Sequence, residues 1–171
     1  LTPFKRNPLM NMNLDTRHLV DPELIELIDL LPDLDISAET LADIRAGMGQ
    51  MEPPNNGADD GLPVDVESRM IDGPQGPGTL RVLIVKPQGA GKDRGGIYHC
   101  HPGGYIIARP EGSLPFLRQT AHSLDAVIVS VDYRLSPEHL YPACHEDGYA
   151  AFEWAAKTYA GLAIVLSGDS A

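Results

Sequence analysis

The peptide Leu-Ala-Ile-Val-Leu-Ser-Gly-Asp-Ser-Ala occupies residues 162–171 and joins an apolar run to a turn of small residues. The apolar part, Leu162–Leu166, is typical of a strand buried on both faces of a parallel sheet. Gly168-Asp169-Ser170 suits the sharp turn of a G-x-S-x-G nucleophile elbow, which exposes the serine Oγ at the carboxyl end of the sheet. The pattern predicts Ser170 as a nucleophile, with an ordinary Gly/Ser turn as the alternative.

A second candidate segment follows the predicted strand Gly96–Cys100 and reads His101-Pro102-Gly103-Gly104. Adjacent glycines let backbone N–H groups converge on one point without interference from Cβ atoms. An esterase needs that geometry to hold a tetrahedral oxyanion, and one such donor is worth about 2.7–4 kcal/mol. The glycine pair and the serine turn in one chain are therefore stronger evidence for this chemistry together than either is alone.

These motifs resemble the hormone-sensitive-lipase-like family of α/β-hydrolases, whose elbow reads G-D-S-A-G. The family's H-G-G-G motif corresponds to residues 101–104, and its D-Y-R-L-A-P-E motif corresponds to Asp132–Glu138. Its P-A and E-D pairs fall within Tyr141–Asp147, and the elbow is Gly168–Ala171. The similarity extends from about Asp21 to the end of the chain.

The resemblance implies an α/β-hydrolase fold, with a mainly parallel sheet, flanking helices and an N-terminal helical cap. It also implies serine-dependent hydrolysis of short-to-medium acyl carboxylic esters through an acyl-enzyme, without a cofactor or a metal ion. Ser170 would be the nucleophile, and the backbone N–H groups of Gly103, Gly104 and Ala171 would bind the oxyanion. Pro102 replaces the first glycine of the motif, and its missing N–H is not one of these donors.

The family's triad acid and base follow the serine in the order Ser…Asp/Glu…His. Nothing follows Ala171 here, so the resemblance implies an N-terminal part only, with the missing C-terminal part as the partner that supplies Asp/Glu and His. Residues 1–171 alone are then expected to be inactive, with Leu162–Ser167 as a bare apolar sheet edge. The alternatives are an inactive fragment or a non-catalytic small-ligand receptor, as in the plant gibberellin receptors.

Composition is that of a globular domain, with 43% hydrophobic and 22% charged residues and a net charge of −11. The acidity argues against nucleic acid or an anionic membrane as a partner. The expected partner is a small ester substrate, and the sequence also allows a homo-oligomer. No apolar run approaches the ~18–20 residues of a membrane span, and the N-terminus lacks a signal-peptide core. Cys100 and Cys144 are expected to be free thiols in a cytoplasmic protein, with a disulfide as the alternative.

Three regions are predicted along the chain: a helical cap segment (1–50), a linker (51–63) and the N-terminal part of the catalytic domain (64–171). The cap contains a helix that begins at Asp21-Pro22 and a second helix that opens at Ser37, and it carries no candidate catalytic group. The later elements alternate as in α/β folds. They are strands Val64–Ile71, Thr79–Lys86 and Gly96–Cys100, helix Ser113–Leu124, strand Ala126–Val131, helix His145–Tyr159 and strand Leu162–Ser167.

Other clusters invite competing interpretations. His99 and His101 could form half a metal site, but no further ligands stand at suitable spacing, and His101 is expected to hydrogen-bond within its own loop. Cys144-His145 with Asp147 resembles a thiol nucleophile beside a base, although ordinary packing explains it better.

An internal triad, His101…Asp132…Ser170, is the remaining catalytic alternative. It is disfavoured because the ring of His101 is expected to turn away from the serine. Asp132, Arg134 and Glu138 are instead expected to form a salt-bridged brace under the site.

Overall fold

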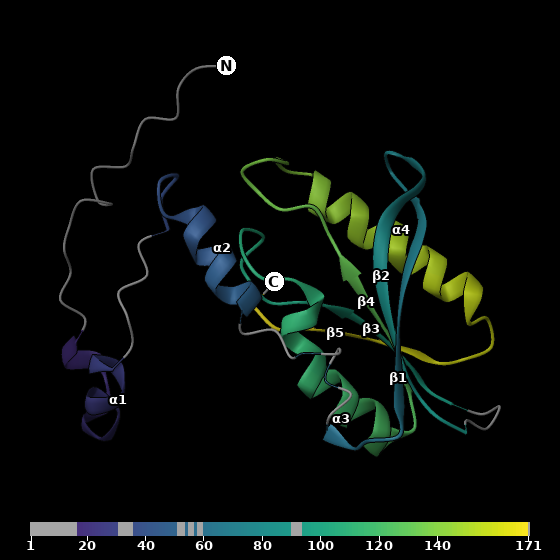
Figure 1. The fold of residues 1–171 in the computed structure, drawn as a ribbon, viewed down its shortest axis with the longest axis horizontal. Helices are drawn as coiled ribbons and strands as arrows, with labels where there is room; N and C mark the ends of the chain where they lie inside the picture. The colour runs from purple at the N-terminus through teal and green to yellow at the C-terminus, as the bar shows by residue number, and fades with distance from the viewer. Residues whose placement is uncertain are drawn as a thin grey trace. The chain divides into compact units, whose positions relative to one another are not determined.

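The computed structural model describes residues 17–30, 36–50, 54, 57, 60–89 and 94–170 of the chain (Figure 1). The chain divides into two compact units, Leu1–Ile36 and Ser37–Ala171. The described residues of the first unit form two 3-10 turns, Arg17–Leu19 and Pro22–Leu24, and helix α1 (Ile25–Asp29). The predicted helix start is confirmed there, because the side chain of Asp21 accepts a 3.0 Å hydrogen bond from the N–H of Glu23 and Pro22 follows it.

The second unit begins with helix α2 (Leu41–Gln50) and is built on a five-stranded sheet. The strands are β1 (Val64–Gly73), β2 (Gly76–Pro87), β3 (Gly96–Cys100), β4 (Val127–Asp132) and β5 (Ile164–Gly168). Their order in the sheet is β1-β2-β4-β3-β5, with antiparallel β1–β2 and β2–β4 pairs and parallel β3–β4 and β3–β5 pairs. The predicted α/β class is confirmed, but where mainly parallel strands were expected the described sheet is mixed, with two antiparallel and two parallel pairs. The predicted boundaries between the cap segment, the linker and the catalytic part, at 50/51 and 63/64, stay a prediction. Helix α2 falls in the same compact unit as the sheet.

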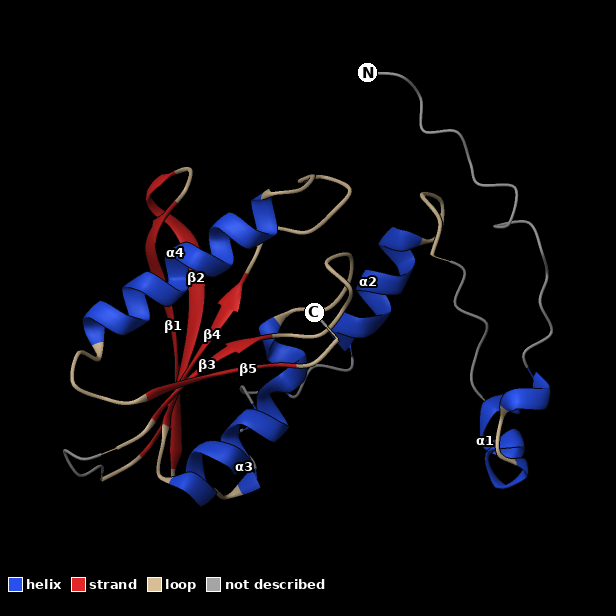
Figure 2. Cartoon of the chain, turned by 180° about the vertical axis from the view of Figure 1, so that it is seen from behind, coloured by secondary structure: helices blue, strands red, loops and turns tan. Residues whose placement is uncertain are grey.

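Helices α3 (Leu114–Leu124) and α4 (Ala143–Thr158) cover opposite faces of the sheet (Figure 2). Alternate residues of β4 serve the two layers, as a strand's period of two requires. Val129 and Val131 pack in the cluster that contains Ala151 of α4, whereas Ile128 packs in the cluster that contains Leu117 of α3. This two-sided burial explains why β4 begins with the apolar run Val127-Ile128-Val129. Among the described residues, no helix has both the length and the apolar character that crossing a membrane requires.

The hairpin between β1 and β2 is tighter than predicted, because residues expected in a loop extend both strands. Gly76 has φ +128°, which glycine adopts without strain, and the carboxylate of Asp72 accepts a 3.0 Å hydrogen bond from the N–H of Gly78. A Cβ on Gly73 would lie 2.7 Å from the Cβ of Leu80, so the close approach of the strands requires glycine. Glycines that indicated a loop here permit pairing instead.

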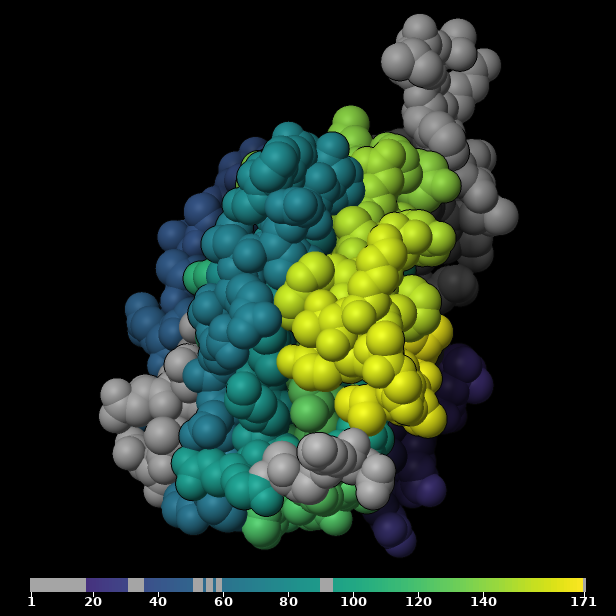
Figure 3. Space-filling model, turned by 90° about the vertical axis from the view of Figure 1, so that its right-hand side faces the viewer, coloured from purple at the N-terminus to yellow at the C-terminus, as the bar shows by residue number. Residues whose placement is uncertain are grey.

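Strand β5 lies at the edge of the sheet and departs from the expected two-sided burial. It pairs with β3, and its side chains Val165 and Leu166 are 63% and 66% exposed. Figure 3 shows yellow residues from the C-terminal part of the chain at the surface of the molecule. The described residues therefore leave the apolar side chains of β5 without the cover that an apolar strand needs.

Arg118 of α3 ties this helix to the segment that leads into β1. Its guanidinium is buried and donates to the carboxylate of Asp60 at 2.7 Å and to the carbonyl of Val64 at 2.8 Å. The hydrogen bond from Arg118 lowers the pKa of Asp60 to about 2. Because this folded-state value lies below the unfolded value of 3.8, the stabilisation is present above pH 4 and is lost as the pH falls toward 2.

We predict that Arg118→Met lowers the free energy of unfolding by about 2–4 kcal/mol, because it leaves buried carbonyl groups without their donor. Urea denaturation at pH 7 measures this change. The matched control is Arg69→Met, which removes an exposed arginine paired with Glu67 and should cost about 0–1 kcal/mol. Equal losses in the two variants would contradict the structural role of Arg118.

Candidate active site

The parallel register of β3 and β5 places the two sequence motifs beside each other. Cys100 is paired with Gly168, so the chain leaves both strands at the same edge of the sheet. The segment 101–108, here called the glycine loop, follows β3, and the turn that contains Ser170 follows β5. β4 is parallel to β3 and ends at Asp132, so the 132–138 segment also starts from the carboxyl end of these strands.

The glycine loop and the serine turn are in direct contact. The N–H groups of Gly103 and Gly104 both donate to the carbonyl oxygen of Ser170, with N···O distances of 3.4 and 3.2 Å. Two amide donors thus converge on one oxygen, which is the arrangement predicted for an oxyanion site. Ala171, the predicted third donor, lies outside the described residues.

Ser170 stands in a sharp turn next to an open hollow. Its φ of +48° is uncommon for a residue other than glycine and fits the strained geometry predicted for a nucleophile elbow. The hollow has a volume of about 450 Å³ and lies over β3 and β5. Ser170 lines it together with Tyr98, Cys100, Leu166, Ser167 and Gly168.

The glycine loop can take this shape only with glycine at its centre. Gly103 has φ +129°, and a Cβ on it would lie 2.0 Å from the carbonyl oxygen of Ile107. The N–H groups of Ile106 and Ile107 both donate to the carbonyl of Gly103 at 3.0 Å, which closes the turn. Tyr105 and Ala108 have φ values of +63° and +66°, each a strain of about 1–3 kcal/mol that surrounding contacts must hold in place.

His101 supports the loop from beneath, as predicted. Its Nδ1 is 2.8 Å from the carbonyl oxygen of Pro102, and its buried ring stacks on Tyr133 with centroids 4.0 Å apart. The hydroxyl of Tyr133 donates to the carbonyl of His101 at 2.7 Å. Burial lowers the pKa of His101, which favours a neutral ring that donates from Nδ1 to the carbonyl of Pro102, while its buried Nε2 has no hydrogen-bond partner among the described residues.

The internal triad His101…Asp132…Ser170 is not assembled in this structure. The Nδ1 of His101 is bonded to Pro102, and the carboxylate of Asp132 accepts a 2.7 Å hydrogen bond from Arg81. Arg81 also binds both carboxylate oxygens of Glu111, at 2.6 and 3.0 Å. Asp132 therefore neutralises an arginine and does not orient an imidazole.

The histidine pair considered as half a metal site is also divided between separate partners. The Nδ1 of His99 lies 2.8 Å from the Oγ of Ser130, and burial lowers the pKa of His99 to about 4. His101 is held by its own loop as described. The described part of the chain contains no group of three His, Cys, Asp or Glu side chains placed to bind a metal ion.

The predicted brace of Asp132, Arg134 and Glu138 exists in a different form. All three side chains are ion-paired, but each has a partner from another part of the chain. Arg134 binds the buried carboxylate of Asp147 through Nε at 2.7 Å and Nη2 at 2.8 Å. Asp147 is therefore not the third member of a Cys144-His145 group, although the Sγ of Cys144 lies 3.1 Å from the Nδ1 of His145.

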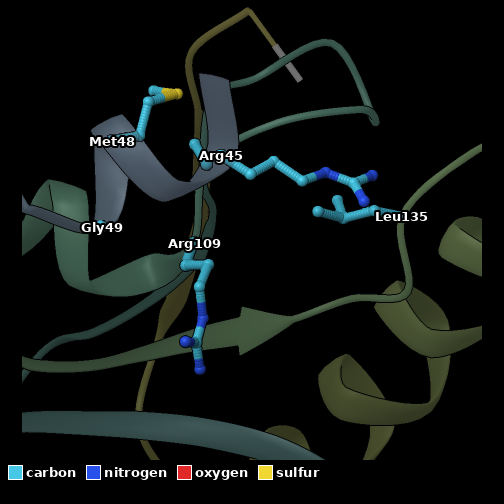
Figure 4. Close-up of a pocket in the computed structure, with 6 residues that line it drawn as sticks. Arg45, Met48, Gly49, Arg109 and Leu135 are labelled. Carbon is cyan, nitrogen blue, oxygen red and sulfur yellow. The ribbon is translucent and has the colours of Figure 1, made fainter. Parts of the chain in front are cut away.

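Arg45 of α2 is a site residue that no sequence motif marked. Its side chain reaches the carbonyl of Ile106 through Nε at 2.9 Å and the carbonyl of Ser136 through Nη2 at 2.7 Å. It also binds the carboxylate of Glu138 at 2.7 and 3.1 Å. Figure 4 shows Arg45 extending from its helix toward Leu135. The only signal in the sequence was an arginine on a helix, which usually faces solvent.

The comparisons with known proteins agree with this geometry. Residues 97–171 match the family described as alpha/beta hydrolase fold. The chain is 31% identical to esterase LipI of Mycobacterium tuberculosis over 173 residues, which cover 96% of this chain and 52% of LipI. It is 37% identical to the hormone-sensitive lipase of Bos taurus over 102 residues, which cover 57% of this chain and 13% of that protein.

A solved structure gives the same result. The hyperthermophilic esterase from the archaeon Pyrobaculum calidifontis superposes with a TM-score of 0.67 at 30% identity. The superposition covers 88% of this chain and 48% of the esterase. This chain thus spans about half the length of LipI and of the archaeal esterase.

We predict that Gly103→Ala opens the glycine loop, because its Cβ would overlap the carbonyl of Ile107 and its φ is unfavourable for alanine. Amide hydrogen exchange of Ile106 and Ile107 should accelerate at least tenfold. Gly112→Ala is the matched control, since a Cβ at that position meets no atom within 4 Å. Unchanged exchange in Gly103→Ala would show that the loop does not depend on glycine at this position.

Proposed function

Because this chain belongs to the α/β-hydrolases and is similar to their hormone-sensitive-lipase-like esterases, we propose that the protein hydrolyses carboxylic esters with Ser170 as the nucleophile. The observation that carries the proposal is the convergence of the Gly103 and Gly104 N–H groups on the carbonyl oxygen of Ser170. In the proposal these two donors exchange the main-chain carbonyl of Ser170 for the carbonyl oxygen of the substrate. The substrates we propose are esters with short-to-medium acyl groups.

In the proposed mechanism the Oγ of Ser170 attacks the ester carbonyl carbon while a base takes its proton. The carbonyl oxygen becomes an oxyanion and accepts hydrogen bonds from Gly103 and Gly104, with Ala171 as a proposed third donor. The C–O bond to the alcohol then breaks, and the alcohol leaves with the proton. Water attacks the acyl-enzyme in the same way and releases the carboxylic acid and Ser170.

The acid and base of the triad are proposed to come from a part of the protein outside these residues. The family resemblance places them after the serine, and this chain spans about half the length of the relatives. The imidazoles of His99 and His101 are bonded to Ser130 and Pro102 instead. The proposal extends to a cytoplasmic location, which the free thiols of Cys100 and Cys144 support.

The first functional prediction compares two variants of the full-length protein. Ser170→Ala should reduce kcat for a chromogenic short-chain ester by about 10⁵-fold or more, because the nucleophile is lost. His101→Ala should reduce it only about tenfold, because His101 holds the glycine loop and does not move a proton. Equal, near-complete losses in two folded variants would favour the internal triad. Ligand binding without any turnover by the wild type would favour a receptor.

The second prediction concerns the chain of 171 residues by itself. It should neither hydrolyse the ester nor remain a soluble monomer, because the apolar side chains of β5, Val165 and Leu166, are exposed at a sheet edge. Adding the remainder of the protein as a second chain should restore both solubility and activity. Size-exclusion chromatography and the ester assay measure the two properties. A monodisperse 171-residue monomer with Ser170-dependent turnover would contradict the proposed division of the triad.

A further inference from the structure

The side chain of Arg45 joins three segments that are far apart in the sequence. Ile106 in the glycine loop is 61 positions from Arg45, Ser136 is 91 positions away, and Glu138 is 93 positions away. The N–H of Ser136 also donates to the carbonyl of Tyr105 at 2.8 Å. Arg45, the glycine loop and the 132–138 segment thus form a closed ring of hydrogen bonds, here called the Arg45 clamp.

The Arg45 clamp holds the part of the glycine loop where the backbone is strained. Tyr105 and Ala108 have positive φ angles, and Ile106, whose carbonyl Arg45 binds, lies between them. Strained backbone of this kind persists only where external contacts fix it. The turn of Ile106 and Ile107 onto Gly103 sets the direction of the Gly103 and Gly104 N–H groups, so a contact at Ile106 bears on both donors.

Packing alone does not hold this side of the loop. A cavity of about 110 Å³ lies between α2 and the loop, lined by Arg45, Met48, Gly49, Ala108, Arg109 and Leu135 (Figure 4). Because side chains beside a void lack contacts on one side, the loop has room to relax there. Hydrogen bonds from Arg45 therefore supply the restraint that close packing supplies elsewhere.

The two kinds of bond that Arg45 makes differ in weight. The side chain of Glu138 is 54% exposed, and exposed ion pairs contribute little to stability. The hydrogen bond from Arg45 lowers the pKa of Glu138, so that carboxylate stays charged and orients the guanidinium. The hydrogen bonds to the carbonyls of Ile106 and Ser136 are partly buried, and they fix the position of the loop relative to α2.

We propose that Arg45 is a positioning residue of the reaction: from α2, it fixes the glycine loop so that the N–H groups of Gly103 and Gly104 face the oxyanion. This inference rests on the proposed ester hydrolysis for its catalytic consequence. It also makes α2 part of the catalytic apparatus, whereas the sequence assigned residues 1–50 to a cap without a candidate catalytic group. Donors displaced by about 1 Å lose about 10²-fold in rate.

The test uses the full-length protein and a chromogenic short-chain ester. Arg45→Ala should lower kcat about 10–100-fold and change KM less than about threefold, because the donors act mainly on the transition state. Arg45→Lys keeps the charge but lacks the planar fork, so kcat should fall by an intermediate factor. Arg69→Ala, which removes an exposed Glu67-paired arginine, is the matched control and should keep the wild-type kcat.

Amide hydrogen exchange of residues 103–108 provides a readout that does not depend on activity. Faster exchange in Arg45→Ala, with a folded core, supports the clamp even if the wild type hydrolyses no ester, a result that would refute only the proposed function. Wild-type kcat and wild-type loop exchange in Arg45→Ala would overturn the proposal. If Arg45→Ala does not fold, Arg45→Lys decides, and wild-type kcat and exchange in that variant would overturn it equally.

Discussion

The parallel register between β3 and β5 is the constraint on which the site depends. Because parallel strands end at the same edge of a sheet, pairing Cys100 with Gly168 brings the glycine loop beside Ser170. A shift of one residue would move the Gly103 and Gly104 N–H groups away from the serine turn and reverse the faces of every side chain on the strand. The apolar layers under α3 and α4 fix β2 and β4, which bury alternate residues on both faces, whereas β5 is held to β3 by their backbone pairing and by Ile164, which packs against the cluster under α4.

Around that register, charged and aromatic groups keep an unfavourable backbone in place. Positive φ angles at Tyr105, Ala108 and Ser170 each cost about 1–3 kcal/mol. His101 and Tyr133 hold the loop from the sheet side through stacking and a hydrogen bond to a carbonyl group. Arg45 holds it from α2. These contacts hold the glycine loop in the shape in which the N–H groups of Gly103 and Gly104 converge on the carbonyl oxygen of Ser170.

The exposed strand β5 connects the stability of the chain with its chemistry. Val165 and Leu166 are exposed in the described structure, although they belong to the apolar run Leu162–Leu166. The same strand carries the serine turn, so whatever covers β5 also lies beside Ser170. Among the described residues β5 is uncovered beside the serine turn, and this chain spans about half the length of LipI and of the archaeal esterase.

The sequence alone indicated most of the elements and the candidate residues Gly103 and Ser170, because both rest on local patterns. Period-two and helical patterns indicated the strands and helices, and the glycine pair and the small-residue turn around Ser170 marked the two loops. Only the tertiary structure decided the ion-pair partners of Asp132, Arg134 and Glu138, the exposure of β5 and the role of Arg45. Such contacts join residues as far apart as Arg45 and Glu138, 93 positions, and no local pattern encodes which distant charge a side chain meets.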